Sequence, residues 1–271
     1  MSDVKNGLSV DFEDWHQPFA ARSISEWKNF ESRVPQDTER ILGLFERLNV
    51  RATFFVLGEV AELFPDCIRA IHRAGHEIAS HGYRHLPLSE QERCLFDLEL
   101  RGSLEFLGEL TGEPVLGFRA PFFSLGPDTL WAVESLKRLG LKYSSSIHPT
   151  VSLFHGFRSA PQQPFDHPNG LREFPITTLP LPGIPIPFGG GLYYRLLPYA
   201  AIRCGLRWLN RRNRPSVVYF HPRELDASLP RLRVGPTLDL IVYTGVDSFE
   251  SKLVRLIQDF RFVPLRELSP W

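Results

Sequence analysis

Apolar positions along the chain follow two alternating patterns. Short runs rich in β-branched and aromatic residues are typical of buried strands, and stretches with apolar residues three and four positions apart are typical of amphipathic helices. We expect strands at residues 7–12, 51–58, 76–81, 115–121, 141–146, 172–177 and 215–221. We expect helices at residues 35–50, 59–75, 128–139 and 248–260, and one more that runs from a Ser89–Glu92 capping box to Leu110.

This alternation predicts a single α/β domain over residues 1–271. Parallel strands joined by crossover helices explain the order, and about seven such units favour a distorted (β/α)7-type barrel over an open sheet. The segment 146–191 is rich in proline and glycine, and we interpret it as long loops at the top of the barrel because strand patterns resume after it. Neither a GxGxxG nor a GxxxxGK[ST] pattern occurs, so a dinucleotide or P-loop site has no support.

Composition narrows the class of protein further. The 31 basic residues balance the 31 acidic ones, so we expect no nucleic-acid partner. Cys67, Cys94 and Cys204 are far apart and read as reduced thiols, which is compatible with the cytoplasm. No apolar run is long enough to predict a membrane span, and the N-terminus lacks the pattern of a signal peptide. We therefore expect a cytoplasmic location.

Candidate chemistry gathers at the ends of the predicted strands, where parallel barrels place their active sites. Asp11, His81, Arg119 and His221 each follow such a strand. His85 stands four positions after His81, and on one helical turn both imidazoles can reach the same ion. Two histidines and a carboxylate leave coordination positions open for water and substrate, as a catalytic metal site requires.

The stretch VDFEDW places Asp11, Glu13 and Asp14 together after the first strand. Carboxylates this close together repel one another unless a cation or a shared proton neutralises part of their charge. Arg119 can form a two-pronged bond to a carboxylate and would hold Asp11 ionised and oriented. His221 emerges from an apolar strand and is a candidate general acid.

These motifs resemble those of the polysaccharide deacetylases of the NodB-homology type, carbohydrate esterase family 4. VDFED is similar to that family's first motif, SHGYRH to its H-[ST]-x-x-H motif, FRAP to its R-x-P motif and FHPRELD to its late histidine motif. The resemblance covers nearly the whole chain. The stretch FGGGLYYRLLPYAAIRCGLRWLN and the D-x-E-[DE]-W shape look closest to a subgroup linked to exopolysaccharide and exosortase gene systems.

The resemblance implies the NodB-homology deacetylase fold and a metal-dependent N-deacetylase, which hydrolyses the acetamido group of an N-acetylated sugar to a free amine and acetate. It implies that Asp11 is the general base that activates the attacking water and that Arg119 orients Asp11. It implies that His221 protonates the departing amine. It also implies a divalent metal, most often Zn²⁺, bound by His81, His85 and a carboxylate.

The identity of that carboxylate is open. In an extended strand Asp11 and Glu13 point the same way, which favours Glu13, whereas a turn directly after Asp11 favours Asp14. We lean to Asp14 because an aspartate is the usual ligand in the family. Two further departures from the family pattern are Gly82, which replaces a hydroxyl residue, and Ser144, which stands where relatives often carry an acid that supports the late histidine.

Substrate contacts are expected beside these motifs, at Pro121, Phe122, Trp15 and His16. The resemblance further implies that a backbone N–H near Phe122 stabilises the oxyanion together with the metal. The substrate would be a nucleotide-linked or lipid-linked sugar or an oligosaccharide, a precursor of a surface polysaccharide.

The segment 192–214 combines arginines with Leu, Tyr and Trp, so it can contact an anionic membrane surface at the inner face of the membrane. Two alternatives keep the same fold. One is a deformylase or an allantoinase-like amidohydrolase, and the other is a non-catalytic carbohydrate-binding homologue.

Overall fold

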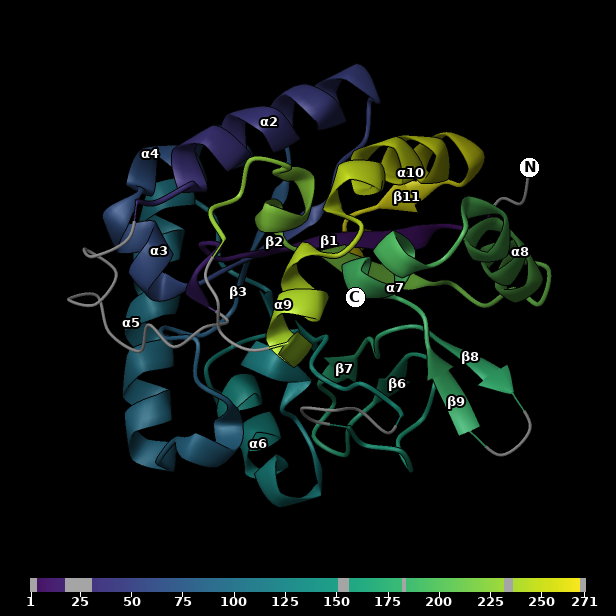
Figure 1. Ribbon diagram of the computed structural model, residues 1–271. Coiled ribbons are helices and arrows are strands. Elements are labelled where there is room, and N and C mark those ends of the chain that lie inside the picture. The colour runs from purple at the N-terminus through teal and green to yellow at the C-terminus, as the bar shows by residue number, and fades with distance from the viewer. Residues whose placement is uncertain (1–3, 18–30, 151–155, 182–183, 232–235, 269–271) are drawn as a thin grey trace.

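The chain folds around one curled sheet in which most strands are parallel (Figure 1). The computed structural model describes residues 4–17, 31–150, 156–181, 184–231 and 236–268. Neighbouring strands follow the order β10, β1, β2, β3, β4, β5, β7, β6, and β11 pairs with the start of β1. The strands are β1 (Asn6–Phe12), β2 (Thr53–Val56), β3 (Glu77–Ser80), β4 (Gly117–Phe118), β5 (Tyr143–Ser144), β6 (Phe165–Asp166), β7 (Arg172–Glu173), β10 (Val217–Phe220) and β11 (Phe262–Val263).

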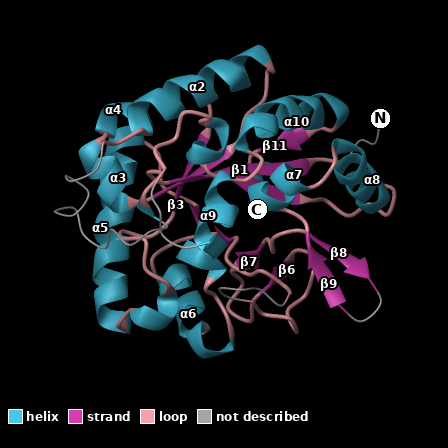
Figure 2. Ribbon diagram, viewed as in Figure 1, coloured by secondary structure: helices cyan, strands magenta, loops and turns pink. Residues whose placement is uncertain are grey.

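Helices alternate with these strands along the chain and surround the sheet (Figure 2). The predicted alternation of strands and helices is confirmed. Among the described strands of this sheet, every pair is parallel except β6 with β7. The helices are α2 (Val34–Arg47), α3 (Gly58–Leu63), α4 (Pro65–Arg73), α5 (Arg93–Thr111), α6 (Trp131–Arg138), α7 (Gly191–Leu196), α8 (Tyr199–Asn210), α9 (Pro236–Tyr243) and α10 (Val246–Asp259). In the described part of the chain, none of them combines the length and the apolar character that a bilayer crossing requires.

The sheet is a half-barrel and not the closed ring that a regular barrel would have. Among the described strands, the ladder ends at β10 on one side and at β6 on the other. Loop residues span the remaining gap: the Val217 N–H donates to the Thr177 side-chain hydroxyl at 2.6 Å, and the Tyr219 N–H donates to the Gly189 backbone carbonyl at 2.9 Å. The curl therefore still gathers the carboxyl ends of the strands at one mouth.

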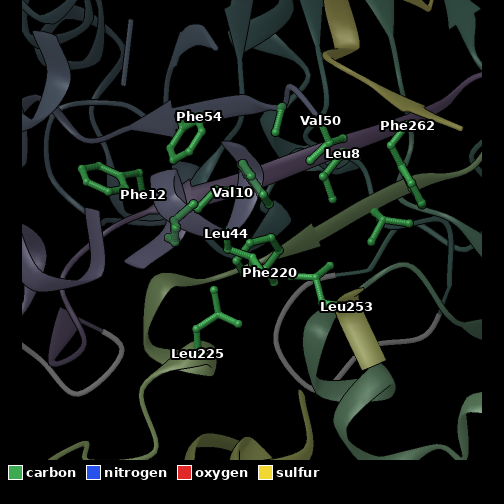
Figure 3. Packing of buried hydrophobic residues seen from close by; sticks show 14 of the residues in the cluster. Leu8, Val10, Phe12, Leu44, Val50, Phe54, Phe220, Leu225, Leu253 and Phe262 are labelled. Carbon is green, nitrogen blue, oxygen red and sulfur yellow. The ribbon is translucent and has the colours of Figure 1, made fainter. Parts of the chain in front are cut away.

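Strand β1 separates the hydrophobic core from the interior of the half-barrel. Its apolar residues Leu8, Val10 and Phe12 pack with residues of β2, β10 and the outer helices (Figure 3). Successive side chains of a strand point to opposite faces, so Ser9 and Asp11 face inward, where both contact Arg119. All seven residues of β1 are buried, which fixes the register because a shift by one residue would place polar groups in the core.

Three features differ from the expectation. The helix predicted at residues 59–75 is two helices, α3 and α4, because Pro65 has no N–H to continue the first and instead begins the second. Ser89 does not cap a helix but lies in a 3₁₀ turn (Leu88–Glu90), and Glu92 is the residue before α5. The segment interpreted as loops contains an antiparallel hairpin of β8 (Thr178–Leu181) and β9 (Ile184–Pro187).

Candidate active site and metal centre

Side chains from four strands meet at the carboxyl end of the half-barrel. Asp11 lies on β1, His81 follows β3, Arg119 follows β4 and His221 follows β10. A cavity of about 150 Å³ is lined by Asp11, His81 and His221, whereas Arg119 lies behind Asp11 and is not part of the lining. Its described lining also includes residues of the second half of the chain, from α7, α9 and β10: Leu192, Tyr193, Arg195, Tyr219, Ile241 and Val242.

A potential metal-binding group lies at the polar end of this cavity. Ligand atoms of Glu13, His81 and His85 all lie within 4.8 Å of one another, and it is the one such group that the described residues contain. His85 Nε2 is 2.8 Å from Glu13 Oε2. Two imidazole nitrogens and one carboxylate oxygen form a donor set that suits Zn²⁺ and leaves a position open for other ligands. The residues therefore fit a divalent metal.

The local structure leaves one ring nitrogen of His81 available to a metal. Its Nδ1 lies 2.8 Å from the carbonyl oxygen of Arg119, which can only accept, so Nδ1 carries the proton and Nε2 presents a lone pair. Burial lowers the pKa of His81 to about 4, and the nearby carboxylate of Asp11 offsets part of this shift. A neutral imidazole is the form that ligates a metal.

The structure groups Glu13, and not Asp14, with the two histidines. Asp14 Oδ1 accepts the backbone N–H groups of Trp15 at 2.9 Å and Arg33 at 3.2 Å, so this carboxylate joins the end of β1 to the start of α2. Glu13 follows the end of β1, where its N–H donates to the Asp11 carbonyl at 3.1 Å, and its carboxylate lies beside His85. The lean to Asp14 is therefore not supported by the geometry.

Glu13 is a buried carboxylate surrounded by cations and imidazoles. Burial raises its pKa, but His85, Arg223 and His221 together outweigh burial, so that its pKa is well below the usual value. Arg223 donates through Nη1 to Glu13 Oε1, while Oε2 faces His85. Glu13 therefore stays ionised, as a metal ligand must be.

Arg119 holds Asp11 from inside the half-barrel. Its Nη1 donates to Asp11 Oδ1 at 2.6 Å and to Ser9 Oγ at 2.9 Å, and its Nε and Nη2 donate to the carbonyl and hydroxyl of Ser145. The guanidinium also lies 4.0 Å from the ring centroid of Phe55. The bond to Asp11 is thus single and not two-pronged, because the other donors of Arg119 bind serines that the sequence alone did not indicate.

His221 stands between three carboxylates. Its Nε2 lies 3.6 Å from Glu13 Oε1 and 4.0 Å from Asp11 Oδ2, and its Nδ1 lies 3.3 Å from Glu224 Oε2. Glu224 therefore supplies an acid beside this histidine even though Ser144 does not. Sequence analysis missed Glu224, although the spacing HPRE gave a signal: Glu224 closes a capping box on the backbone N–H of His221.

The remaining predicted substrate contacts divide into two groups. Phe122 lines the cavity, with its ring centroid 4.4 Å from that of His85. Phe122 and the next residue have φ values of 58° and 54°, and such left-handed conformations cost about 1–3 kcal/mol each and occur mostly at functional sites. Pro121, Trp15 and His16 are not part of the lining, and Trp15 is only 2% exposed and donates through Nε1 to the Glu31 carbonyl.

Comparison with known families divides the chain into two segments. Residues 26–144 match the model described as polysaccharide deacetylase, and residues 145–269 match a model described as a domain of unknown function. A peptidoglycan-N-acetylglucosamine deacetylase from Bacillus cereus is 35% identical over 98 residues, which cover 36% of this chain and 36% of that protein. The chain thus spans about a third of the length of this curated relative.

Solved structures support the fold over nearly the full length. A proposed polysaccharide deacetylase from Mycobacterium smegmatis superposes with a TM-score of 0.65 at 21% identity, over 99% of this chain and 90% of that chain. An allantoinase (PuuE) superposes with a TM-score of 0.60 at 17% identity, over 97% of this chain and 87% of that chain. At these identities the likeness concerns the α/β half-barrel alone. The likeness to polysaccharide deacetylases at the level of sequence thus concerns residues 26–144.

Proposed function

We propose that this protein is a metal-dependent N-deacetylase that hydrolyses the acetamido group of an N-acetylated sugar. The observation that supports the proposal most strongly is the gathering of Asp11, Glu13, His81, His85 and His221 around one cavity. A family match and a curated relative named as a deacetylase point the same way. Glu13, His81 and His85 would hold the metal, for which we propose Zn²⁺, and a bound Zn²⁺ supplies Lewis-acid polarisation of the substrate carbonyl.

Asp11 and His221 divide the proton transfers of the hydrolysis. Asp11, oriented by Arg119, takes a proton from the attacking water, whose oxygen forms a bond to the acetyl carbon. His221 delivers a proton to the sugar nitrogen as the C–N bond breaks, so that the products are a free amine and acetate. The Nε2 of His221 faces the Asp11 side of the cavity, 4.0 Å from its carboxylate, so both groups can reach one scissile bond.

A precursor of a surface polysaccharide is the substrate that we propose. It would be nucleotide-linked, lipid-linked or an oligosaccharide, and the protein would belong to the subgroup associated with exopolysaccharide systems. The relative from Bacillus cereus acts, by its name, on peptidoglycan N-acetylglucosamine, so a peptidoglycan-type sugar belongs in the same assay.

An allantoinase-like or deformylase reaction is the second candidate, since the fold likeness extends to an allantoinase. Ring opening of a hydantoin and release of formate are therefore assayed beside release of acetate. A non-catalytic homologue would be expected to have lost a key group, whereas here the proposed base, ligand set and late histidine line one cavity and Arg119 donates to the base.

Contact with an anionic membrane surface is a further part of the proposal, and we limit it to part of the segment 192–214. Arg195 is buried and Arg203 pairs with Asp259 at 2.9 Å, so neither adds to a basic surface. The exposed basic side chains lie at the end of α8, around Trp208 and Arg212, whose guanidinium stacks at 3.9 Å on the Trp208 ring. We propose a cytoplasmic protein that rests on the inner face of the membrane through this region. Equal flotation with neutral and anionic liposomes would reject this contact.

The function itself is tested by metal analysis and acetate release on the same preparation. The proposal predicts about one bound Zn²⁺ per chain, at full occupancy of a single site, and acetate release from N-acetylated sugars that chelation abolishes. Asp11→Asn should keep the metal and lose about 10²–10⁴-fold in turnover, as removal of a general base does. Metal binding without turnover on any acylated sugar would instead favour the non-catalytic homologue.

A further inference from the structure

A buried ion pair joins α7 to the segment that carries His221. Arg195 Nε donates to Glu224 Oε1 at 2.8 Å, and both side chains are at most 2% exposed. Both residues also line the candidate cavity. Gly191, one turn before Arg195, leaves room for the pair, because a Cβ at this position would lie 2.0 Å from Glu224 Oε2. The chain is therefore built closely around this carboxylate.

The other oxygen of Glu224 binds His221 in two ways. Oε2 accepts the backbone N–H of His221 at 3.0 Å and lies 3.3 Å from its Nδ1. Burial raises the pKa of Glu224, but Arg195 and His221 outweigh burial and bring the pKa to about 2, so the carboxylate is ionised and only accepts. Nδ1 must then carry the proton of the contact, which leaves Nε2 to face the cavity.

Arg195 also holds the wall of the cavity. Its Nη1 donates to the carbonyls of Val242 at 3.1 Å and Thr244 at 2.7 Å, and its Nη2 donates to the carbonyl of Ile241. These carbonyls belong to the end of α9 and to the turn after it, and Ile241 and Val242 line the cavity. Figure 1 shows α7 and α9 next to each other beside the central strands. One guanidinium thus connects the apolar wall of the cavity to the carboxylate behind His221.

We propose that Glu224 and Arg195 are positioning residues for proton delivery: Glu224 fixes the ring of His221 with Nε2 toward the substrate nitrogen, and Arg195 holds Glu224 while seating α9 against the same cavity. The inference rests on the proposed function of His221. A purely structural role is a weaker account of the pair, because buried ion pairs contribute little net stability compared with apolar packing. Neighbours that orient a working histidine typically change activity by about 10–100-fold when removed.

Glu224→Gln, which keeps the shape and removes the charge, tests this role with two substrates. The zinc-loaded full chain is assayed with an N-acetylglucosamine oligosaccharide, whose amine must be protonated to leave, and with 4-nitrophenyl acetate, whose phenolate leaves without a proton. We expect acetate release from the amide to fall by about 10–100-fold and hydrolysis of the ester to change little. Arg195→Lys should recover most of the activity that Arg195→Met loses. Arg203→Met, which removes an exposed ion pair with Asp259, is the matched control.

Equal losses on both substrates, or no loss on either, would overturn the positioning role. ¹⁵N NMR of the histidine rings provides a measurement that does not depend on turnover. At a pH where the ring is neutral, the wild-type chain should show the Nδ1–H tautomer of His221, whose protonation at Nε2 gives the imidazolium that delivers the proton. The tautomer is identified by its absence in His221→Gln, and Glu224→Gln should lose it. A wild-type chain that hydrolyses no acylated substrate but shows this tautomer would contradict the proposed function alone. An unchanged tautomer in Glu224→Gln would overturn the inference alone.

Discussion

Arg119→Met is expected to be among the most damaging single changes in the half-barrel. Arg119 is 0% exposed and donates to Asp11, to Ser9 and twice to Ser145. Methionine fills most of the same volume but leaves Asp11 as a buried charge without its cation. Breaking a buried pair in this way typically costs about 3–5 kcal/mol, which is a large fraction of the about 5–15 kcal/mol that holds a typical protein folded.

The double variant Asp11→Asn/Arg119→Met separates the lost pair from lost packing. Each single change leaves one buried charge unpaired, whereas the double change leaves none, so the double variant should cost less than the sum of the single costs. We expect a coupling free energy of about 1–3 kcal/mol. Urea unfolding of the metal-free wild type and the three variants, monitored by circular dichroism, gives the loss of unfolding free energy in each variant. Costs that add to within about 0.5 kcal/mol would show that Arg119 does not act through the charge of Asp11.

Three further predictions concern other parts of the molecule. Burial and the nearby charge of Asp226 raise the pKa of Asp37 to about 7, so Asp37 binds a proton in the folded chain between pH 4 and 7 that it has lost in the unfolded chain. The contribution of Asp37 to stability should therefore fall over this window by up to about 4 kcal/mol, and the stability of Asp37→Asn relative to the wild type should be higher at pH 8 than at pH 5 in urea unfolding. A relative stability of Asp37→Asn that falls from pH 5 to pH 8 would refute this sign. Gly191→Ala should lower the free energy of unfolding by about 1–3 kcal/mol, because the new methyl group would overlap with Glu224. The control Gly102→Ala should not lower it, because a methyl group there meets nothing within 4 Å. Similar effects of the two changes would contradict the close fit around Gly191. His81→Ala should abolish the rise in melting temperature that added Zn²⁺ gives the wild type, and an undiminished rise would place the metal elsewhere.

The sequence was most informative where one physical rule dominates. The alternation of buried strands with amphipathic helices predicted the order of elements, and the ends of parallel strands predicted that Asp11, His81, Arg119 and His221 would share one mouth. The choice between Glu13 and Asp14 stayed open in the sequence, because both residues follow the first strand directly. The structure favours Glu13, since the carboxylate of Asp14 is already bonded to the backbone N–H groups of Trp15 and Arg33, whereas that of Glu13 lies 2.8 Å from His85 Nε2.

Other parts of the site depend on packing between distant segments, which no local pattern records. Arg195 looked like one of several arginines on a basic helix, yet its guanidinium is enclosed by Glu224 and the end of α9, elements that the chain order separates by dozens of positions. Trp15 and His16 looked like pocket residues because they follow the acidic cluster. They are instead buried beside it, since the chain turns away from the cavity after Glu13.

The central claim is that Glu13, His81 and His85 bind one divalent metal at the mouth of the half-barrel. The most direct test is calorimetric Zn²⁺ titration of the metal-free wild type, Glu13→Gln and Asp14→Asn, with circular dichroism to confirm that each variant is folded. Removing a residue that only orients a metal ligand typically weakens metal binding by about 10–100-fold. Glu13→Gln removes a ligand itself, so its zinc affinity should fall by more than this range. Asp14→Asn should bind zinc nearly as tightly as the wild type. Wild-type affinity in Glu13→Gln, together with a large loss in Asp14→Asn, would contradict the account.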